Sequence, residues 1–522
     1  MNQNNITQDL PQLVFVETFG QTAIFEAPAE ELLNITRVFR NDKNFRFVSM
    51  TATDERSSWG GFKVWYIFSV PKEQGFIALF IKLKDTENFP SLSIDFPDTW
   101  NYERKINTFF GLTPVGHPDL RPFILHENWP ADIFPLRKDF SWNTKPKIAN
   151  GVYNFQEVGG EGVYEIPVGP IHAGIIEPGH FRFSVAGEEI VQLEPRLGFT
   201  HKGVEKLFEV LSMDDKVKLS EKISGDSSFS HSLAFCQALE QLANTKPTER
   251  VDYLRVIFSE LERLANHLGD IGAIMLDAGF NFGGSHCARL RETVMLVSER
   301  LTGNRFLRGL NIPGGITKDI DDQERVRIVR NLENLLKDFS EIVKVAENSA
   351  SLLNRLKGTG ILSRSIAESY GAVGIAAKAT GLKRDVRVEF PYAAYDKLIL
   401  ETIEIEVDGD VYARFYVRIK EVRASIRLII QALQVLPEGA LVNEIKKTLP
   451  KNTVTVSLVE GWRGEIVYFV TTDSEGKIDR VAPRDPSFVN WSLLGQVSLG
   501  NVVPDFPLIN KSFNLSYSGN DL

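Results

Sequence analysis

The sequence has few groups that could hold a metal cluster or a disulfide framework. Only two of its 522 residues are cysteines, Cys236 and Cys287. Two thiols can neither supply the cysteines of an iron–sulfur cluster nor build a framework of disulfides. This scarcity favours a reducing compartment or indifference to redox state, and we expect the chain to bind no cofactor of its own.

Long apolar runs and blocks of positive charge are also missing. No stretch approaches the ~20 consecutive apolar residues needed to cross a bilayer. The first residues lack the basic start and apolar core of a signal peptide. Because the formal net charge is −9 and no long Lys/Arg block occurs, we expect no nucleic-acid partner. Any association with a membrane must therefore run through other proteins.

The composition that is present, 43% apolar and 24% charged residues, is typical of a globular protein with room for about three domains. Apolar runs over 64–70 and 76–83 predict two strands, and residues 27–40 predict a helix. We therefore predict a small α/β domain over residues 1–145. Near its end, His117 and Asp119 are interpreted as holding a turn by hydrogen bonds to the backbone.

Residues 146–163, rich in glycine and polar side chains, have linker composition. Beyond them, apolar residues at helical spacing predict helices over 248–268, 287–302, 322–350 and 412–436, and alternating runs predict strands over 453–460 and 464–472. The sequence therefore predicts an α+β protein whose second domain, residues 164–522, is mainly helical with small β additions.

One predicted helix, over residues 248–268, carries charge opposite its apolar stripe. Glu260, Arg263 and His267 follow one another at three- and four-residue spacing, which places them on one face. We interpret this face as a solvated row of ion pairs. The alternative is a path for protons.

A loop over residues 169–180 is the most unusual stretch of the chain. Three glycines and two prolines in twelve residues exclude a helix or a central strand, so the backbone must form a tight loop. The loop contains His172, Glu177 and His180. The alternation after it predicts a hairpin that turns at Ala186 and Gly187.

Several motifs, in the right order, carry a resemblance to a known family. They are the 169–180 loop and the segments 109–121, 199–206, 260–267, 381–387 and 484–490. Together they resemble the large, catalytic-type subunit of the [NiFe] hydrogenase and respiratory complex I superfamily, fused to a domain of the complex I 30 kDa type. The resemblance covers most of the chain and implies the corresponding folds for the two domains.

The resemblance also identifies positions whose chemistry has changed. In the hydrogenases, two Cys-x-x-Cys pairs hold the nickel–iron centre. Here Ser224, Ser227, Ser516 and Gly519 occupy those four positions. A serine hydroxyl stays protonated at neutral pH, whereas a metal readily deprotonates a thiol, so we expect no metal site and no [NiFe] hydrogenase activity.

Complex I relatives use a histidine and a tyrosine to reduce quinone. The resemblance places Ile176 and Gly225 at those positions, and neither side chain can donate a proton. Quinone reduction of the complex I type is therefore an alternative function and not our first hypothesis.

Glu177 is the candidate with the clearest chemistry. The resemblance implies that the matching glutamate passes protons to and from a reaction site. The alternative is a carboxylate that caps backbone N–H groups in the loop. We interpret His172 and His180 as residues that fix the loop by hydrogen bonds rather than as metal ligands.

Asp385 and Arg387 match a pair that lies beside the active cavity in relatives. Two interpretations stay open, a structural ion pair at the cavity wall and a polar lining that contacts a substrate. If the cavity is still used, we expect Glu177 to face this pair across it.

The pattern of retained and lost residues resembles the energy-converting hydrogenase-related complexes most. It implies a peripheral subunit on the cytoplasmic face of the cell membrane, with an iron–sulfur small subunit and membrane-embedded ion-transport subunits as partners. One hypothesis is electron transfer from a [4Fe–4S] cluster of that partner to an unknown acceptor, coupled to proton movement. The other is a redox-silent scaffold that docks or gates the membrane subunits, so whether the chain is an enzyme stays open.

Overall fold

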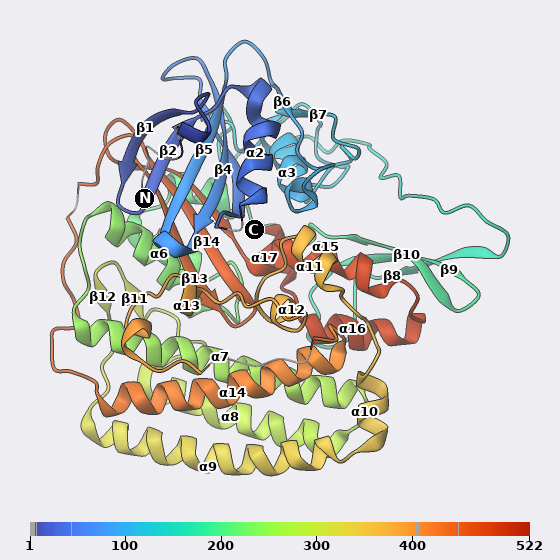
Figure 1. Cartoon of the computed structure of the whole chain (residues 1–522), viewed down its shortest axis with the longest axis vertical. Coiled ribbons are helices and arrows are strands. Elements are labelled where there is room, and N and C mark those ends of the chain that lie inside the picture. Colours follow the sequence, from blue (N-terminus) through green and yellow to red (C-terminus); the bar gives the residue numbers. More distant parts are fainter. Residues whose placement is uncertain (1–5, 7, 43, 402–406, 447) are drawn as a thin grey trace.

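A computed structural model describes residues 6, 8–42, 44–401, 407–446 and 448–522. The residues 1–5 and 7, on which the expectation of no signal peptide rests, lie outside the described residues. Figure 1 shows an N-terminal sheet at the top, a smaller sheet beneath it and a stack of long helices below. Of the described helices, none is both long enough and apolar enough to cross a membrane.

The N-terminal part is a five-stranded sheet with helices on one face. The strand order is β1-β2-β5-β4-β3, and only the β2–β5 pair is parallel. Its strands and helices are β1 (Val14–Phe19), β2 (Thr22–Glu26), α2 (Leu32–Asn41), β3 (Arg46–Glu55), β4 (Gly61–Val70), β5 (Gly75–Leu83) and α3 (Trp100–Phe110). Two short strands, β6 (Asn88–Pro90) and β7 (Thr113–Val115), pair beside it.

The two strands predicted in this part are confirmed as β4 and β5. The predicted helix is shorter at its start, because Pro28 and the 3-10 turn η1 (Ala29–Glu31) precede Leu32. The continuous apolar run of β4 has a physical reason, since both faces of the sheet are covered. Successive side chains of β4 point to opposite faces of the sheet, so Tyr66 and Ile67 belong to two different hydrophobic clusters.

The second face of the N-terminal sheet packs on the C-terminal sheet β13 (Val454–Gly461), β14 (Gly464–Thr472) and β15 (Ile478–Arg484). Trp65 of β4 lies 5.4 Å from Phe469 of β14, measured between ring centroids. Phe76 of β5 stacks on Phe390 at 5.2 Å. The two parts of the chain therefore share a hydrophobic cluster, and the division at residues 145 and 163 stays a prediction.

No helix or strand occurs between Val115 and Val163, a range that the structure describes throughout. A three-stranded sheet follows and projects to the side in Figure 1. Its strands are β8 (Val163–Val168), β9 (His180–Ala186) and β10 (Glu189–Arg196). The predicted hairpin is confirmed, but its turn lies at Gly187 and Glu188, one residue later than predicted, because Ala186 still pairs with Glu189. Gly187 adopts the left-handed conformation that such a turn requires (φ 66°).

Long helices form the lower layer, and three of them begin at a side chain that caps the helix. Thr248, Asp321 and Asp410 accept backbone N–H groups at the starts of α7 (Glu249–Asp277), α9 (Asp322–Glu347) and α14 (Val411–Gln434). The layer also contains α8 (Asn281–Thr302), whereas α6 (Ser228–Leu242) and α15 (Pro486–Ser498) lie above it in Figure 1.

Short elements connect these helices. They are α4 (Val204–Val210), α5 (Met213–Ser220), β11 (Asn311–Ile312), β12 (Gly315–Ile316), α10 (Ala350–Leu356), α11 (Arg364–Ser369), α12 (Gly374–Lys378), α13 (Val386–Glu389), α16 (Phe506–Phe513) and α17 (Tyr517–Asp521). The predicted helices are confirmed with different limits. The helix predicted from residue 248 continues to Asp277. The one predicted over 322–350 ends at Glu347, and a separate helix, α10, begins after its cap Ser349.

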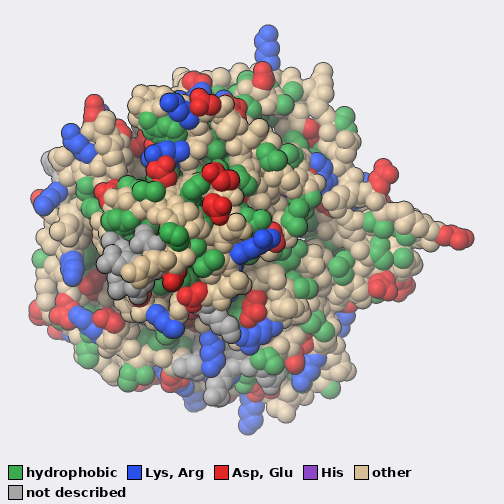
Figure 2. All heavy atoms as spheres, turned by 45° about the horizontal axis from the view of Figure 1, so that its top comes forward, with side chains coloured by type: hydrophobic (Ala, Val, Ile, Leu, Met, Phe, Trp, Pro, Cys, Tyr) green, Lys and Arg blue, Asp and Glu red, His purple; other side chains and the backbone are tan. Residues whose placement is uncertain are grey.

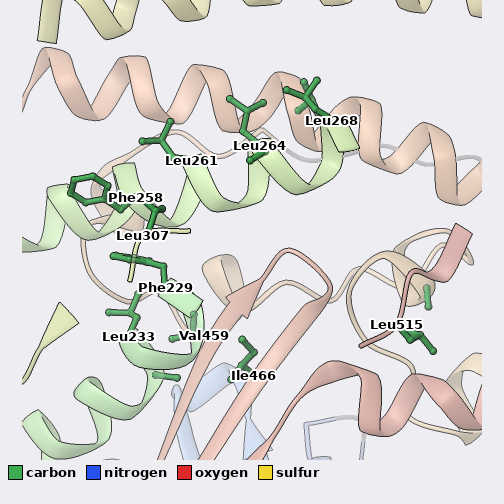
Figure 3. Packing of buried hydrophobic residues seen from close by; sticks show 14 of the residues in the cluster. Phe229, Leu233, Phe258, Leu261, Leu264, Leu268, Leu307, Val459, Ile466 and Leu515 are labelled. Atoms are coloured by element: carbon green, nitrogen blue, oxygen red, sulfur yellow. The ribbon is translucent and has the colours of Figure 1, made fainter. Parts of the chain in front are cut away.

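The largest hydrophobic cluster joins α6 and α7 to β13 and β14. Figure 3 shows Phe229 and Leu233 of α6, Phe258 of α7 and Val459 of β13 in this cluster. Because α6 packs between the C-terminal sheet and α7, the segment just before α6 is held at the centre of the domain. That segment contains Ser224 and Ser227.

The prediction of a solvated face on α7 is wrong. Glu260, Arg263 and His267 have at most 2% of their surface exposed. Glu260 forms an ion pair with Arg387 and accepts a hydrogen bond from Ser425 of α14. Both partners are far away in sequence, so the spacing on one helix could not reveal that the face is covered.

Candidate functional site

A pocket of about 510 Å³ opens where several motifs of the sequence meet. The 169–180 loop, the segment before α6, the C-terminal half of α7, the start of α8 and residues 511–518 line it. Four of its charged or polar lining residues are Glu177, Asp226, Asp270 and Arg463. The pocket therefore gathers residues from several separate regions of the chain.

Two of the four positions that the resemblance assigns to lost metal ligands, called the former ligand positions below, meet in this pocket. The hydroxyl oxygens of Ser224 and Ser516 lie 2.8 Å apart, although the residues are 292 positions apart in sequence. Ser516 caps α17 by accepting the N–H of Gly519 at 2.9 Å. The Ser227 hydroxyl lies 3.5 Å from Asp226 Oδ1. The convergence that the resemblance implies is thus present, with hydroxyls in place of thiols.

Asp226 and Arg463 surround this pair of serines with charge. Arg463 donates two hydrogen bonds to the Asp226 carboxylate, at 2.6 and 2.7 Å, and a third to the Ser224 hydroxyl at 3.2 Å. Burial alone would raise the pKa of Asp226, but the Arg463 guanidinium holds it below its usual range. The serines are therefore embedded in a fixed ion pair of the chain itself.

Gly519, the fourth former ligand position, has no room for a side chain. A Cβ atom there would lie 2.6 Å from Cγ of Asp485. Asp485 is itself fixed, because its carboxylate lies 3.0 Å from His231 Nε2 and accepts the Ser487 N–H at 2.7 Å, capping α15. Three hydroxyls and an occupied space do not fit a centre held by four thiolates.

We expect Gly519→Ala to destabilise the protein by about 1–3 kcal/mol, because the new methyl group must displace the buried Asp485 carboxylate. Gly225→Ala is the matched control in the same pocket, since its Cβ would meet only the end of the Arg308 side chain, at 3.4 Å. Equilibrium unfolding in denaturant measures both. Equal stability of the two variants would show that Asp485 does not fill the fourth position tightly.

The segment 198–202 holds residues 521 and 522 against this site. The Asp521 carboxylate accepts the N–H groups of Gly198 and Thr200, both at 3.0 Å, and the Thr200 hydroxyl at 2.6 Å. Lys202 donates to the carbonyl of Ile223 at 3.1 Å, next to Ser224. Burial lowers the pKa of Lys202, and the nearby charge of Glu177 opposes that effect.

Glu177 lines the pocket and is half-buried. Its Oε2 atom accepts the Ser518 N–H at 3.3 Å, which ties the loop to α17. His172 Nε2 lies 2.7 Å from the Gly179 carbonyl oxygen, and His180 Nδ1 lies 3.4 Å from that of Gly169. Both histidines thus lie within the hydrogen bonding of the loop itself, and neither is among the residues that line the pocket.

Asp385 and Arg387 form an ion pair, with Arg387 donating to both carboxylate oxygens at 2.9 and 2.6 Å. They lie in a buried group of charges between α7, α14 and β13 rather than among the residues that line the pocket. Ile176 and Gly225, which the resemblance places at the complex I histidine and tyrosine, do line it.

The residues that sequence reasoning missed are Asp226, Asp270, Arg463 and Asp485. Asp226 lies in sequence between Ser224 and Ser227, which the resemblance identified, and this position could have marked it as a residue of the site. Arg463 occupies the β13–β14 turn, where an arginine carries no signal of its own.

The two parts of the chain match two described families. Residues 25–146 match "Respiratory-chain NADH dehydrogenase, 30 Kd subunit", and residues 277–457 and 447–521 match "Respiratory-chain NADH dehydrogenase, 49 Kd subunit". The two matches follow one another along the chain, so the chain is a subunit in which a 30 kDa-type part is fused to a 49 kDa-type part.

Comparison with individual proteins agrees with these two family matches. The chain is 34% identical to hydrogenase-4 component G of Escherichia coli K12 over 90% of this chain and 82% of the relative. It is 30% identical to the C/D component of the NADH-quinone oxidoreductase of Phocaeicola vulgatus over 84% and 88%. The structure of an archaeal membrane-bound sulfane sulfur reductase has a chain that is similar with a TM-score of 0.65 and 27% identity, over 69% of this chain and 99% of that one. The chain belongs to the family of fused complex I 30 kDa and 49 kDa-type subunits that includes hydrogenase and NADH-quinone oxidoreductase components.

Proposed function

We propose that the chain is a peripheral-arm subunit of a membrane-bound, ion-translocating complex and that it works without a nickel–iron centre. It takes electrons from a [4Fe–4S] cluster of an iron–sulfur partner and passes them to an acceptor in the 510 Å³ pocket, and Glu177 moves the accompanying protons. Its place is the cytoplasmic face of the membrane, with ion-transport subunits embedded in the membrane as further partners. The family membership supports the assembly, because its relatives are named as components of hydrogenase and respiratory complexes.

The observation that carries this proposal is a retained pocket without its metal ligands. Ser224 and Ser516 still meet at the pocket wall, yet their hydroxyls, Asp226 and Arg463 satisfy one another. The open pocket has the volume of a small-molecule binding site, and it keeps polar groups at its wall. These features support a binding site that now takes a ligand other than the metal centre.

The lining charges favour an anionic acceptor. Four cations, Arg291, Arg308, Arg463 and Lys511, line the pocket against three carboxylates, Glu177, Asp226 and Asp270. A polysulfide is an anion whose S–S bond takes up two electrons and releases two sulfur anions that accept protons. Sulfane sulfur is therefore the first acceptor class to test, and the name of the archaeal relative supports the choice.

One observation favours the second hypothesis, a redox-silent scaffold. The polar groups at the former ligand positions are already hydrogen bonded to one another, as in a purely structural site. A partner protein without the cysteines to hold a cluster would decide for the scaffold. Quinone reduction of the complex I type has no such support, because Ile176 and Gly225 line the pocket in place of proton donors.

The complex purified from its native source should contain no stoichiometric nickel, because the chain offers no thiolate at the four former ligand positions. Elemental analysis measures this, with iron expected only in the amount that partner clusters require. In the same preparation, added polysulfide should reoxidise the reduced clusters. About one nickel per chain would refute the metal-free proposal, and clusters that no polysulfide reoxidises would remove sulfane sulfur as the acceptor.

A further inference from the structure

The charged stripe of α7 continues from the pocket into the centre of the protein. Glu260, Arg263, His267 and Asp270 follow at intervals of three or four residues and are all buried. At the pocket end, the Asp270 carboxylate accepts Arg418 of α14 at 2.8 Å and Asn514 at 2.6 Å. At the inner end, Glu260 accepts Ser425 of α14 at 2.5 Å and Tyr395 at 2.6 Å. The two helices thus enclose a row of polar side chains that starts at the pocket wall.

The inner end of this row is a cluster in which carboxyl groups outnumber cations. Its ion pairs join four acidic residues to three basic ones, namely Glu260, Asp385, Glu421 and Glu460 to Arg263, Lys378 and Arg387. Six of these seven charged groups are buried, and the Asp385 side chain is 15% exposed. Charges gathered in this way are costly unless each is compensated. With all groups ionised, one negative charge of this cluster has no counterpart within it. A bound proton would restore the balance.

Glu460, in β13, is the carboxyl group of the cluster that lies farthest from the basic side chains. Lys378 lies 2.7 Å from both Asp385 and Glu421 but 3.6 Å from Glu460. Arg387 pairs with Glu260, Asp385 and Glu421, and Glu460 has only the Val386 N–H as a closer donor among the described residues, at 3.1 Å. Glu460 is therefore the group on which the missing proton fits.

His267 lies between this cluster and the pocket with unused hydrogen-bonding capacity. It is fully buried, and neither ring nitrogen has a hydrogen-bond partner among the described residues. The charges that act on it are Glu421, Arg418, Arg263 and Lys378, and its ring lies edge-on to Trp462 at 6.1 Å between centroids. A buried imidazole without partners is rare, because an unmet donor or acceptor is costly.

We propose that the cluster is a proton-binding site, with the proton held on Glu460, and that His267 carries this proton between the cluster and the pocket. On the way out, the proton leaves the Glu460 carboxyl through the Lys378 ammonium and the Glu421 carboxylate, which lie in contact, and reaches one His267 nitrogen. Since neither ring nitrogen has a hydrogen-bond partner among the described residues, the imidazole must turn or be joined by water to make these contacts, and its other nitrogen then releases the proton toward Asp270 and the pocket. No electron or further reactant is needed.

The electrostatics of the two groups fit these two roles. Burial, reinforced by the charge of Asp385, raises the pKa of Glu460 to about 7, although Lys378, Arg387 and Arg263 oppose the rise. Outside the cluster, Arg46 of β3 also attracts it, and Glu465 lies opposite on β14. Burial lowers the pKa of His267 well below its usual range, so His267 can pass a proton but not store it.

Infrared spectroscopy of the full-length chain tests the site directly, through the C=O stretching band that only a protonated carboxyl group gives. Spectra taken on either side of about pH 7 should differ by bands from several carboxyl groups, because burial also raises the pKa values of Glu103 and Glu262 to about 7. Glu460→Gln should delete one band, and the control Glu262→Gln a different one. A band set that Glu460→Gln leaves unchanged would overturn the proposal.

The same band, followed after a rapid pH jump, tests His267. His267→Phe should leave the equilibrium intensity of the Glu460 band unchanged but slow its decay by at least about tenfold, because the ring shape stays and the nitrogens are lost. The control His286→Phe, in α8, should change neither. If His267→Phe fails to fold, His267→Gln gives the same comparison. A decay as fast as in the unmodified chain would overturn the carrier role.

A second readout follows from linkage. Glu460 has a higher pKa in the folded chain than the usual value of 4.5, so ionising it costs stability as the pH rises from about 4.5 through about 7. The melting temperature of the Glu460→Gln variant should therefore fall less over that pH range than the melting temperature of the unmodified chain. An unchanged pH profile would count against the bound proton. None of these measurements depends on the acceptor or on ion transport, so the proton site and the proposed function can fail separately.

Discussion

Arg387→Met should destabilise the protein by about 3–5 kcal/mol, although methionine fills most of the same volume. The Arg387 side chain is fully buried and lies 3.1 Å from Glu260, 2.6 Å from Asp385 and 2.9 Å from Glu421. Its removal leaves three carboxylates with only Lys378 and Arg263 to compensate them. Denaturant unfolding measures the loss.

The matched control is Arg289→Met, which breaks an ion pair with Asp338 whose side chains are 55% and 45% exposed. An exposed pair of this kind contributes about 0–1 kcal/mol. Similar losses for the two variants would show that the buried cluster does not depend on Arg387.

The effect of Arg387→Met should also depend on pH. Although burial acts in the opposite direction, Arg387 and Lys378 hold the pKa of Glu421 well below its usual range. A depressed carboxyl pKa contributes stability that is present above the usual value of 4.5 and is lost as the pH falls through the lower folded value. The difference between the variant and the unmodified chain should therefore be largest near neutral pH and shrink in acid.

Local patterns in the sequence were sufficient for the long helices and for several core strands. Periodicity placed α7, α8, α9 and α14, because a helix buries one stripe whatever packs against it. The strand β3 was missed because its residues, such as Thr51, Thr53 and Asp54, mix polar and apolar types on a strand that is buried on both sides. Its polar groups find partners there, since Trp65 donates to the Thr53 hydroxyl at 3.0 Å.

The site was predictable only where motif spacing fixed it. The serine positions followed from the resemblance, and the structure brings Ser224 and Ser516 together. The partners of Glu260 could not be read from its helix, because Arg387 and Ser425 are 127 and 165 residues away. Charged residues at helical spacing look the same on a solvated face and on a buried one, and only the fold distinguishes them. Figure 2 shows the usual surface case, with Lys/Arg and Asp/Glu side chains interspersed on the visible face.

Glu177→Gln should abolish ion transport and proton-coupled turnover of the assembled complex while the fold persists. Glutamine keeps the volume of the side chain and an oxygen that can accept the Ser518 N–H, now 3.3 Å from Oε2. Stability should therefore fall by no more than about 1 kcal/mol. The amide cannot release a proton, so any step that needs Glu177 as a proton carrier stops.

The control for this variant is Glu165→Gln in β8, which breaks an exposed pair with Arg182 in the same projecting sheet. It should leave both transport and assembly unchanged, because its carboxylate lies outside the pocket. A comparable loss of transport in both variants would point to assembly rather than to proton transfer.

Ion transport by the reconstituted complex carrying Glu177→Gln is the most direct measurement of the central claim that the former metal pocket is still in use. We predict that transport is lost, with the complex intact and the unfolding midpoint of the chain close to that of the unmodified form. Transport at the unmodified rate would contradict this account. Glu177 would then be a loop cap, and the chain a scaffold.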